Sequence, residues 1–359
     1  MVPDEVRAEV AGARPVRSED AFDVDAVASW LSSEAGVTGV PEVRQFSGGA
    51  SNLTYLLRYP DRDLILRRPP SGQKAKGAHD VAREFRIQSQ LAPVFPHVPT
   101  MVALCEDESV IGSPFYVMER LVGHIPRKGL GLSLTSQEVR RLCTNAVDLL
   151  VELHSIDVEA TGLASLGKGD GYVGRQVAGW SARYRKARTR NVGSFEKVMR
   201  WLDENQPADV RSCLIHNDFR LDNLVLSPDE PTRPIGLLDW EMATVGDPLM
   251  DLGGALAYWV QADDGRAFRL FRRQPTHVAG MMTRREVVDY YTSRAGLTLT
   301  DREWAFYEVF GLFRLAVICQ QIYYRYYHKQ TTNPAFRHFG LAVVMLELRC
   351  RRLIRKAGR

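Results

Sequence analysis

The apolar pattern of the chain changes near residue 118, and this change limits the folds that the chain can adopt. Earlier segments are short and alternate or run apolar, as strands do: Val40–Phe46, Leu53–Tyr59, Leu64–Arg67, Met101–Leu104 and Pro114–Met118. Later segments are long, without strand alternation: Thr135–His154, Pro248–Val260, Arg284–Ala295, Asp301–Tyr327 and Pro334–Ile354. We therefore predict an α+β fold with a small β-rich half and a larger, mostly helical half.

A few further elements complete the prediction. Helices are expected at Phe22–Ala35 and Ala78–Leu91, and short strands at Cys213–Ile215, Leu224–Leu226 and Ile235–Leu238. The expected boundary separates an N-terminal lobe, residues 1–120, from a C-terminal lobe, residues 121–359. Residues 1–20 are polar and weakly patterned, so a loose tail is expected there.

Composition limits the class of protein. The formal net charge of +4 does not suggest a nucleic-acid partner. The five cysteines are scattered without a CxxC pair, which favours reduced thiols over disulfides or zinc. The N-terminus lacks the apolar core of a signal peptide, and no uninterrupted apolar run reaches the roughly 18 residues of a membrane span. A soluble, cytoplasmic protein is therefore expected.

The strongest chemical signal is the segment from His216 to Asn223, which reads HNDFRLDN and precedes Asp239 by sixteen residues. Phosphoryl transfer needs a carboxylate that positions and deprotonates a hydroxyl, together with oxygen ligands for Mg²⁺. In this pattern Asp218 is the base, and Asn223 and Asp239 are the Mg²⁺ ligands. The alternative is that these residues only form Asx turns.

A glycine-containing turn lies between the first two predicted strands. It comprises Gly48, Gly49, Ser51 and Asn52, and its backbone N–H groups could hold the phosphates of ATP. Taken alone, a Gly-Gly pair between strands is more often a simple hairpin turn, and its place in the β-rich half favours phosphate binding.

Two further segments fit nucleotide binding. A basic residue on the third strand, Arg67 or its neighbour Arg68, could contact phosphates and pair with Glu84 on the following helix. The second segment is the end of a predicted strand and the connector after it, which include Glu119 and Leu121. Their backbone N–H and C=O groups could bind adenine. Alternatively, this is a plain buried strand.

Other polar residues near these motifs have structural readings. Asp247 before Pro248 is typical of a helix N-cap, and Asp251 could form a hydrogen bond back to the His216–Asn223 loop. His154 is expected to be a core histidine. Arg220 is a candidate contact for substrate or phosphate.

The HNDFRLDN segment, the Leu238–Glu241 motif and Gly246-Asp247-Pro248 together resemble the aminoglycoside phosphotransferase and choline kinase-like family. Further segments, including Leu66–Pro70 and Phe310–Ala316, are similar to the branch that contains the N-terminal kinase domain of acyl-CoA dehydrogenase family member 11. The resemblance covers roughly residues 40–350. Arg67 departs from it, since more distant kinases have Lys there, and Asn217 stands where Gly is common.

The resemblance implies a protein-kinase-like, two-lobed fold and transfer of phosphate from ATP, with Mg²⁺, to a hydroxyl of a small molecule. The branch further implies a hydroxyacyl-CoA or related hydroxy acid as the acceptor. Residues 252–359 hold 18 Lys/Arg and 8 Asp/Glu, whereas residues 1–251 hold 29 Lys/Arg and 35 Asp/Glu. This basic C-terminal region suits an anionic partner. The alternative is that it is only a solvated basic tail. The alternatives are an aminoglycoside or macrolide antibiotic kinase and a nucleotide-binding pseudokinase module. The oligomeric state is not predicted.

Overall fold

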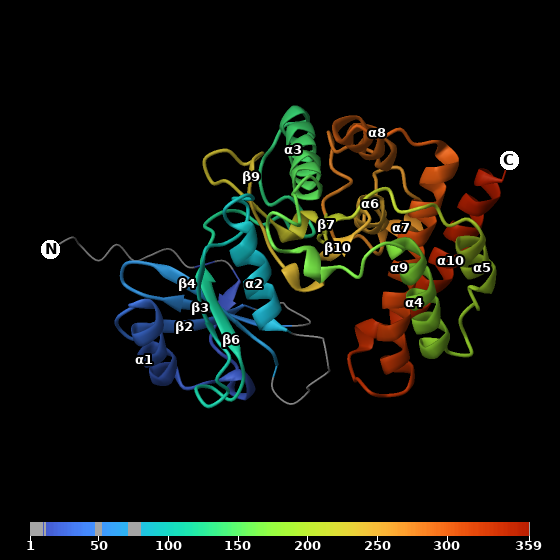
Figure 1. Ribbon diagram of the computed structural model, residues 1–359. Helices are drawn as coiled ribbons and strands as arrows, with labels where there is room; N and C mark the ends of the chain where they lie inside the picture. Colours follow the sequence, from blue (N-terminus) through green and yellow to red (C-terminus); the bar gives the residue numbers. More distant parts are fainter. Residues whose placement is uncertain (1–9, 11, 47–51, 71–79, 359) are drawn as a thin grey trace. The chain divides into compact units, whose positions relative to one another are not determined.

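The computed structural model describes residues 10, 12–46, 52–70 and 80–358, and the chain divides into two compact units, Met1–Val122 and Gly123–Arg359. The first unit is built on an antiparallel sheet in the order β1-β2-β3-β4-β6-β5 (Figure 1). Its strands are β1 (Ala13–Arg14), β2 (Glu42–Phe46), β3 (Leu53–Arg58), β4 (Asp63–Arg68), β5 (Met101–Cys105) and β6 (Phe115–Glu119). Its helices are α1 (Val24–Ala35) and α2 (Val81–Leu91).

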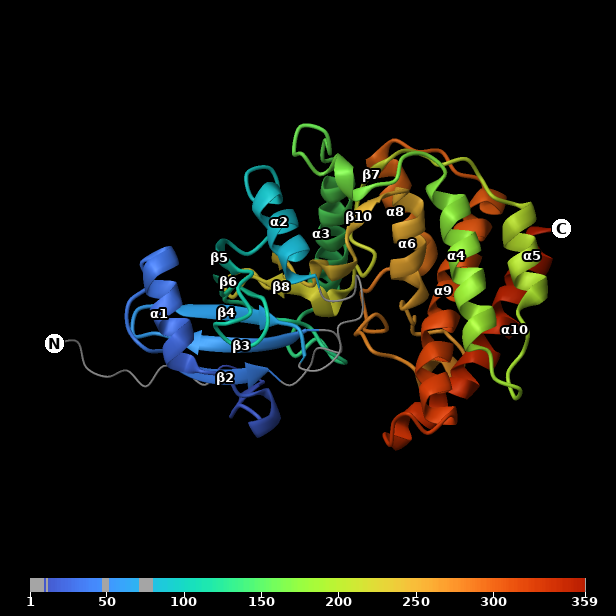
Figure 2. The ribbon, with the colours of Figure 1, turned by 60° about the horizontal axis from the view of Figure 1, so that its bottom comes forward.

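Alternation along the strands gives the sheet of the first unit two apolar faces. On β3, Tyr55 and Leu57 pack with Leu31 of α1, whereas Leu56 packs on the other face with Val81 of α2. Figure 2 shows both helices beside the strands. Burying both faces explains why the middle residues of β3 and β4, Tyr55–Leu57 and Leu64–Leu66, are apolar without alternation.

The expectation of a loose tail over residues 1–20 is wrong for residues 13–20, which are ordered. Ala13–Arg14 pairs with β2, and a 3₁₀ turn follows at Ser18–Asp20. The Asp20 carboxylate accepts a hydrogen bond from Gln45, and its carbonyl accepts one from Tyr55. These partners lie more than 20 residues away, so the local pattern gives no sign of them.

The second unit is mostly helical. Its helices are α3 (Ser136–His154), α4 (Tyr172–Ala187), α5 (Glu196–Glu204), α6 (Pro248–Ala257), α7 (Arg266–Arg269), α8 (Arg284–Ala295), α9 (Asp301–Tyr327) and α10 (Phe339–Ala357). Short strands β7 (Cys213–Ile215) and β10 (Thr244–Gly246) pair with each other, as do β8 (Leu224–Leu226) and β9 (Pro234–Leu237). The predicted helix Pro248–Val260 ends at Ala257, and the predicted Pro334–Ile354 is a 3₁₀ turn, Pro334–His338, followed by α10.

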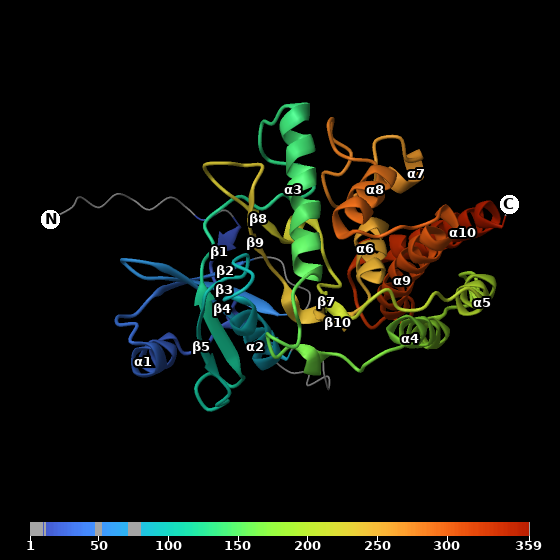
Figure 3. The ribbon, with the colours of Figure 1, turned by 45° about the horizontal axis from the view of Figure 1, so that its top comes forward.

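Helix α9 is the core element of the second unit and packs against α6 and α10 (Figure 3). Within the described residues it alone is long and apolar enough to cross a membrane, which departs from the expectation that no segment would be. Buried core helices pass the same test, and 72% of its most apolar window is buried. This is therefore weak evidence for a span.

Candidate active site

The loop from His216 to Asn223 connects β7 to β8 and brings two predicted site residues into contact. The Asn223 side-chain amide donates hydrogen bonds to the Asp218 carbonyl at 2.8 Å and to Asp218 Oδ2 at 3.2 Å. Asn223 is 7% exposed, and its carbonyl accepts the N–H of Leu238 at 2.8 Å. That bond fixes the chain next to Asp239.

Asp239 has a left-handed backbone conformation, with φ of 70°. Non-glycine residues seldom adopt this conformation, and Asp and Asn tolerate it best. Its neighbours are tightly held, because Trp240 is fully buried and donates to the Leu237 carbonyl, and His216 Nε2 lies 3.1 Å from the Leu238 carbonyl. Such strain persists where surrounding contacts enforce it, often at functional sites.

The Asp218 side chain remains 23% exposed. Burial raises the pKa of its carboxyl group above the ordinary value, and the charge of Asp239 adds to this rise, while Arg220 and His216 oppose it. The Asp218 and Asp239 carboxylates thus repel each other. Mutual repulsion between such groups would be relieved by a cation.

The Arg220 side chain lies beside Asp218, the candidate base. Its Nε is 3.7 Å from Asp218 Oδ1, and its NH2 group donates to Asp222 Oδ2 at 3.0 Å. The guanidinium also stacks over the Tyr258 ring, 5.2 Å from the centroid. These contacts fix Arg220 beside Asp218, where it partly neutralises the carboxylate.

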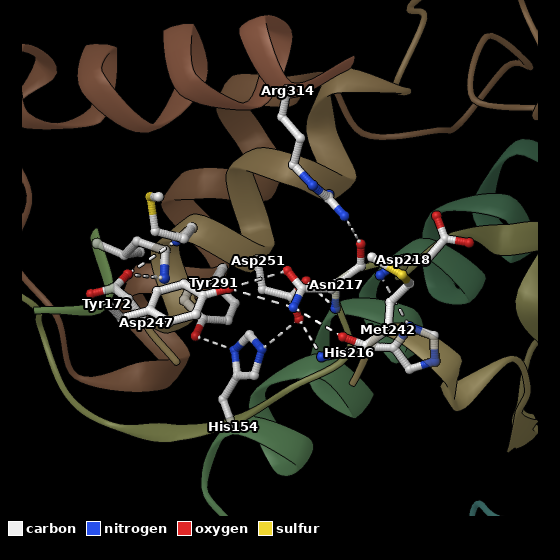
Figure 4. A network of polar contacts seen from close by, with 12 residues as sticks. His154, Tyr172, His216, Asn217, Asp218, Met242, Asp247, Asp251, Tyr291 and Arg314 are labelled. Atoms are coloured by element: carbon white, nitrogen blue, oxygen red, sulfur yellow. Dashed lines mark hydrogen bonds and ion pairs between the residues drawn. The ribbon is translucent and has the colours of Figure 1, made fainter. Parts of the chain in front are cut away.

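Asp251, on α6, holds the start of the loop (Figure 4). Its carboxylate accepts the N–H of His216 and the N–H of Asn217, each at 2.8 Å, and it pairs with His154 Nε2 at 3.1 Å. His154 is about 1% exposed, and its Nδ1 contacts the Tyr291 hydroxyl at 2.7 Å. The predicted hydrogen bond from Asp251 back to the loop and the core role of His154 are therefore confirmed.

Asp247 caps α6. Its carboxylate accepts the N–H groups of Leu249 and Met250, and Pro248 occupies the first helical position. The predicted N-cap is confirmed. This cap fixes the start of the helix that carries Asp251.

In the first unit, Glu84 is the centre of a buried polar cluster. It accepts hydrogen bonds from Asn52 Nδ2 at 2.6 Å and from the Tyr116 hydroxyl at 2.9 Å, and Arg67 lies 3.4 Å away. Arg67 on β4 and Tyr116 on β6 are directly paired in the sheet, so both side chains face α2. Glu84 is 1% exposed and Arg67 12%, so this ion pair is well shielded from water.

Arg68 lies on the opposite face of β4. Its guanidinium bonds to the Tyr55 hydroxyl and the Asp20 carbonyl and lies over the rings of Phe22 and Tyr55. Of the two arginines left open by the sequence, the structure pairs Arg67 with Glu84 and gives Arg68 a packing role.

Glu119 and Leu121 differ in the backbone groups that they can offer. The Glu119 N–H donates to the Thr100 carbonyl at 2.8 Å, while within the described residues Leu121 makes no backbone hydrogen bond. In the predicted contact with adenine, Glu119 would therefore accept a hydrogen bond at its carbonyl, and Leu121 would donate one from its N–H. Gly48, Gly49 and Ser51 lie outside the described residues, as does the rest of that turn except Asn52.

The donor set of the predicted metal site suits Mg²⁺. Asn223 and Asp239 supply hard oxygen atoms, and Mg²⁺ typically takes one or two protein ligands and completes its shell with water and phosphate oxygens. In the part of the chain that the structure describes, no group of three or more His, Cys, Asp and Glu residues could hold a metal. A two-ligand site that needs a bound nucleotide is consistent with both observations.

Three contacts to the loop were not predicted from the sequence. Arg314 of α9 donates to the Asn217 carbonyl, the Tyr172 hydroxyl lies 3.5 Å from the Asn217 side chain, and Gln274 accepts the N–H of Leu221 at 2.8 Å. Each partner lies more than 40 residues from the loop. No local pattern signals such contacts.

Comparisons with known proteins show the family to which the chain is similar in sequence. The sequence profile of the phosphotransferase enzyme family matches residues 42–287. Acyl-CoA dehydrogenase family member 10 of Mus musculus is 38% identical over 94% of the chain, and family member 11 of Rattus norvegicus is 32% identical over 85% of it. The chain spans only 32% and 40% of these relatives.

Solved structures extend the likeness to the fold. A Ralstonia eutropha protein named as a candidate aminoglycoside phosphotransferase is 29% identical, with a TM-score of 0.80 over 94% of this chain and 99% of that one. A macrolide 2′-phosphotransferase from Brachybacterium faecium is 16% identical, with a TM-score of 0.56 over 89% and 98%. The predicted α+β, kinase-like fold is thereby confirmed.

Proposed function

Because the chain belongs to the phosphotransferase enzyme family, we propose that it is a kinase that transfers the γ-phosphate of ATP to a hydroxyl group of a small molecule. The observation that carries the proposal is the contact between Asn223 and Asp218, together with the bond that ties Asn223 to the segment of Asp239. This arrangement unites a carboxylate for the acceptor hydroxyl with two oxygen ligands for a metal.

Each residue has a defined role in this proposal. Asp218 orients the acceptor hydroxyl and takes its proton. Asn223 and Asp239 would hold Mg²⁺, which neutralises phosphate charge when bound. In the first unit, Arg67 contacts phosphate, and Glu84 orients its guanidinium; Glu119 and Leu121 meet the adenine.

We further propose that the acceptor is a hydroxyacyl-CoA or a related hydroxy acid. The two mammalian relatives are named as acyl-CoA dehydrogenase family members, which makes an acyl-CoA a chemically sensible partner. Charge supports the same class, since an anionic thioester suits the excess of Lys and Arg in residues 252–359.

Four arginines between residues 266 and 273 add to this support. Arg266, Arg269, Arg272 and Arg273 form no ion pair with an acidic residue among the described residues, whereas Arg284 and Arg349 both bind Asp264. Gln274, which is bonded to Leu221, directly follows Arg273. Gln274 therefore ties the end of this segment to the loop that carries Asp218, and guanidinium groups are suited to phosphate.

The test is ATP consumption with 3- and 4-hydroxyacyl-CoA thioesters, compared with the matching pantetheine thioesters, which lack the nucleotide phosphates. We expect turnover with the CoA thioesters and a much higher KM with the pantetheine thioesters. Asp218→Ala should lower kcat by at least about a hundredfold, while the exposed Asp229→Ala serves as the control. Absence of turnover with every thioester would exclude this acceptor class.

An antibiotic acceptor is the second candidate, because several solved structures of the same fold are named as aminoglycoside or macrolide phosphotransferases. The same assay with kanamycin, hygromycin B and a macrolide separates the two candidates. Turnover of a drug alone, lost in Asp218→Ala, would favour the antibiotic kinase. ATP binding without turnover of any acceptor would favour a pseudokinase module.

A further inference from the structure

Arg314 is a buried arginine of α9 that reaches the residue before Asp218. Its NH2 group donates a hydrogen bond to the Asn217 carbonyl at 2.7 Å (Figure 4). The residue is 8% exposed, and its guanidinium lies over the Trp180 ring, 5.4 Å from the centroid. Arg314 therefore holds the peptide group that leads into the candidate base.

Close packing of two helices places Arg314 there. A methyl group on Gly311 of α9 would lie 2.1 Å from the Gly253 carbonyl of α6, and one on Gly253 would lie 2.5 Å from the Tyr307 carbonyl. A methyl group on Gly254 would lie 2.9 Å from Arg314 NH1. The glycines thus allow the backbones to touch and leave room for the guanidinium.

Burying this charge is costly, and among the described residues no acidic side chain forms an ion pair with it, although its charge opposes the rise that burial causes in the pKa of Asp218. Within the described residues Arg314 forms no ion pair, in contrast to Arg349, which is also largely buried but binds Asp264. A buried guanidinium without an ion-pair partner is unusual, because removing a charge from water is unfavourable. Among the described residues, the one hydrogen bond that Arg314 donates goes to the loop, which points to a role in holding that loop.

Asn217 itself is held from several sides. Its φ is 64°, its N–H donates to Asp251 of α6, and its side-chain amide donates to the Met242 carbonyl at 3.1 Å. Arg314 adds a contact from α9 on the carbonyl side of the residue. A left-handed residue between two anchored ends fixes the direction in which the next side chain leaves the backbone.

We propose that Arg314 is a positioning residue for the phosphotransfer reaction: together with Asp251 it clamps Asn217 and thereby fixes the orientation of Asp218. The expected effect on kcat rests on the proposed function. The expected effect on the order of the loop does not, because the clamp holds residues 216–218 whether or not an acceptor is known.

The kinetic test compares Arg314→Met with the matched control Arg349→Met, which removes a second buried arginine that stacks on an aromatic ring. Arg314→Met should lower kcat by about 10- to 100-fold, as expected for a displaced catalytic group, and should leave KM for ATP within about twofold. Arg314→Lys, which keeps a charged donor, should recover much of the loss. Arg349→Met should destabilise the fold while leaving kcat nearly unchanged.

The structural test is hydrogen exchange of the backbone amides of residues 216–218. Arg314→Met should speed their exchange, and Arg349→Met should not. Equal loss of kcat in the two Met variants, or no recovery in Arg314→Lys, would overturn the positioning role. If the wild-type protein phosphorylates nothing, unchanged exchange in Arg314→Met would refute the clamp independently of the proposed function.

Discussion

Glu84 in the first unit and Asp251 in the second are both about 1% exposed, yet they hold different kinds of group. The described partners of the Glu84 carboxylate are side chains: an amide, a phenol and a guanidinium. Asp251 binds two backbone N–H groups and one imidazole. The first carboxylate therefore orients the side chain of Arg67, whereas the second fixes the path of the backbone.

This difference predicts different consequences of removing the charge. A side chain that loses one partner can rotate to another, but a buried backbone N–H has no such freedom. The charge of Glu84 should thus matter mainly for nucleotide binding. The charge of Asp251 should matter for both folding and catalysis.

The largest effect is expected for Asp251→Asn. The amide nitrogen of the variant would face the N–H of His216 or of Asn217, so one buried donor would lose its acceptor. We expect the free energy of unfolding to fall by about 3–5 kcal/mol and kcat to fall at least about a hundredfold. Urea denaturation and steady-state kinetics measure both. A variant with native stability would contradict the backbone role.

Glu84→Gln should have a smaller and more selective effect. The glutamine can still bond with Asn52 and Tyr116, but Arg67 loses its charged partner. We expect a stability loss of about 1–2 kcal/mol, with a clear rise in KM for ATP. If Glu84→Gln destabilised the protein as much as Asp251→Asn, the comparison between side-chain and backbone anchoring would fail.

Two neighbouring arginines sharpen the comparison within the first unit. Arg67→Lys should weaken ATP binding by about tenfold, because an ammonium cannot bond bidentately to phosphate. Arg68→Lys should lower the melting temperature, because Arg68 packs on Phe22 and Tyr55, and should leave KM for ATP unchanged. Equal effects of both variants on KM would contradict the assignment of Arg67.

The smallest effect concerns pH. Burial lowers the pKa of His216 below its ordinary value of 6.5, so the folded protein keeps this imidazole neutral. The unfolded chain takes up the proton first, so stability is full above pH 6.5 and falls as the pH decreases, by up to about 1.4 kcal/mol per pH unit for this group.

The neutral His216 accepts the N–H of Asp218 at Nδ1 and donates from Nε2 to the Leu238 carbonyl. His216→Gln should reduce the slope of stability against pH between 5 and 6.5. His338→Gln is the control, since it removes an exposed histidine that lies outside the loop. An unchanged slope in His216→Gln would show that His216 is not the group responsible.

Much of the fold could be predicted from local sequence because many element ends carry clear signals. Helices α8 and α9 begin and end where predicted, and both start with a capping box, Thr283 with Glu286 and Thr300 with Glu303. Helices α4 and α5 were missed. The residues before them, Gly171 and Phe195, have positive φ and no side-chain cap, so the usual start signals are absent.

In the candidate site, too, only features with a local sequence signal could be predicted. Asp218, Asn223 and Asp239 could be proposed together because their spacing is a known kinase pattern, and the structure brings Asn223 against Asp218. The functional roles of these residues stay predictions. The choice between Arg67 and Arg68 needed the pleat of β4, and the contact of Arg314 needed the crossing of α6 and α9, since both depend on long-range geometry.

The crossing at Gly253, Gly254 and Gly311 also limits how this protein could be engineered. In an exposed helix interior, replacing Gly with Ala typically raises stability by up to about 1 kcal/mol. At these three positions the added methyl would meet a backbone atom or the Arg314 guanidinium at 2.1–2.9 Å. A thermostabilisation programme that follows helix propensity alone would therefore be expected to lose activity here first.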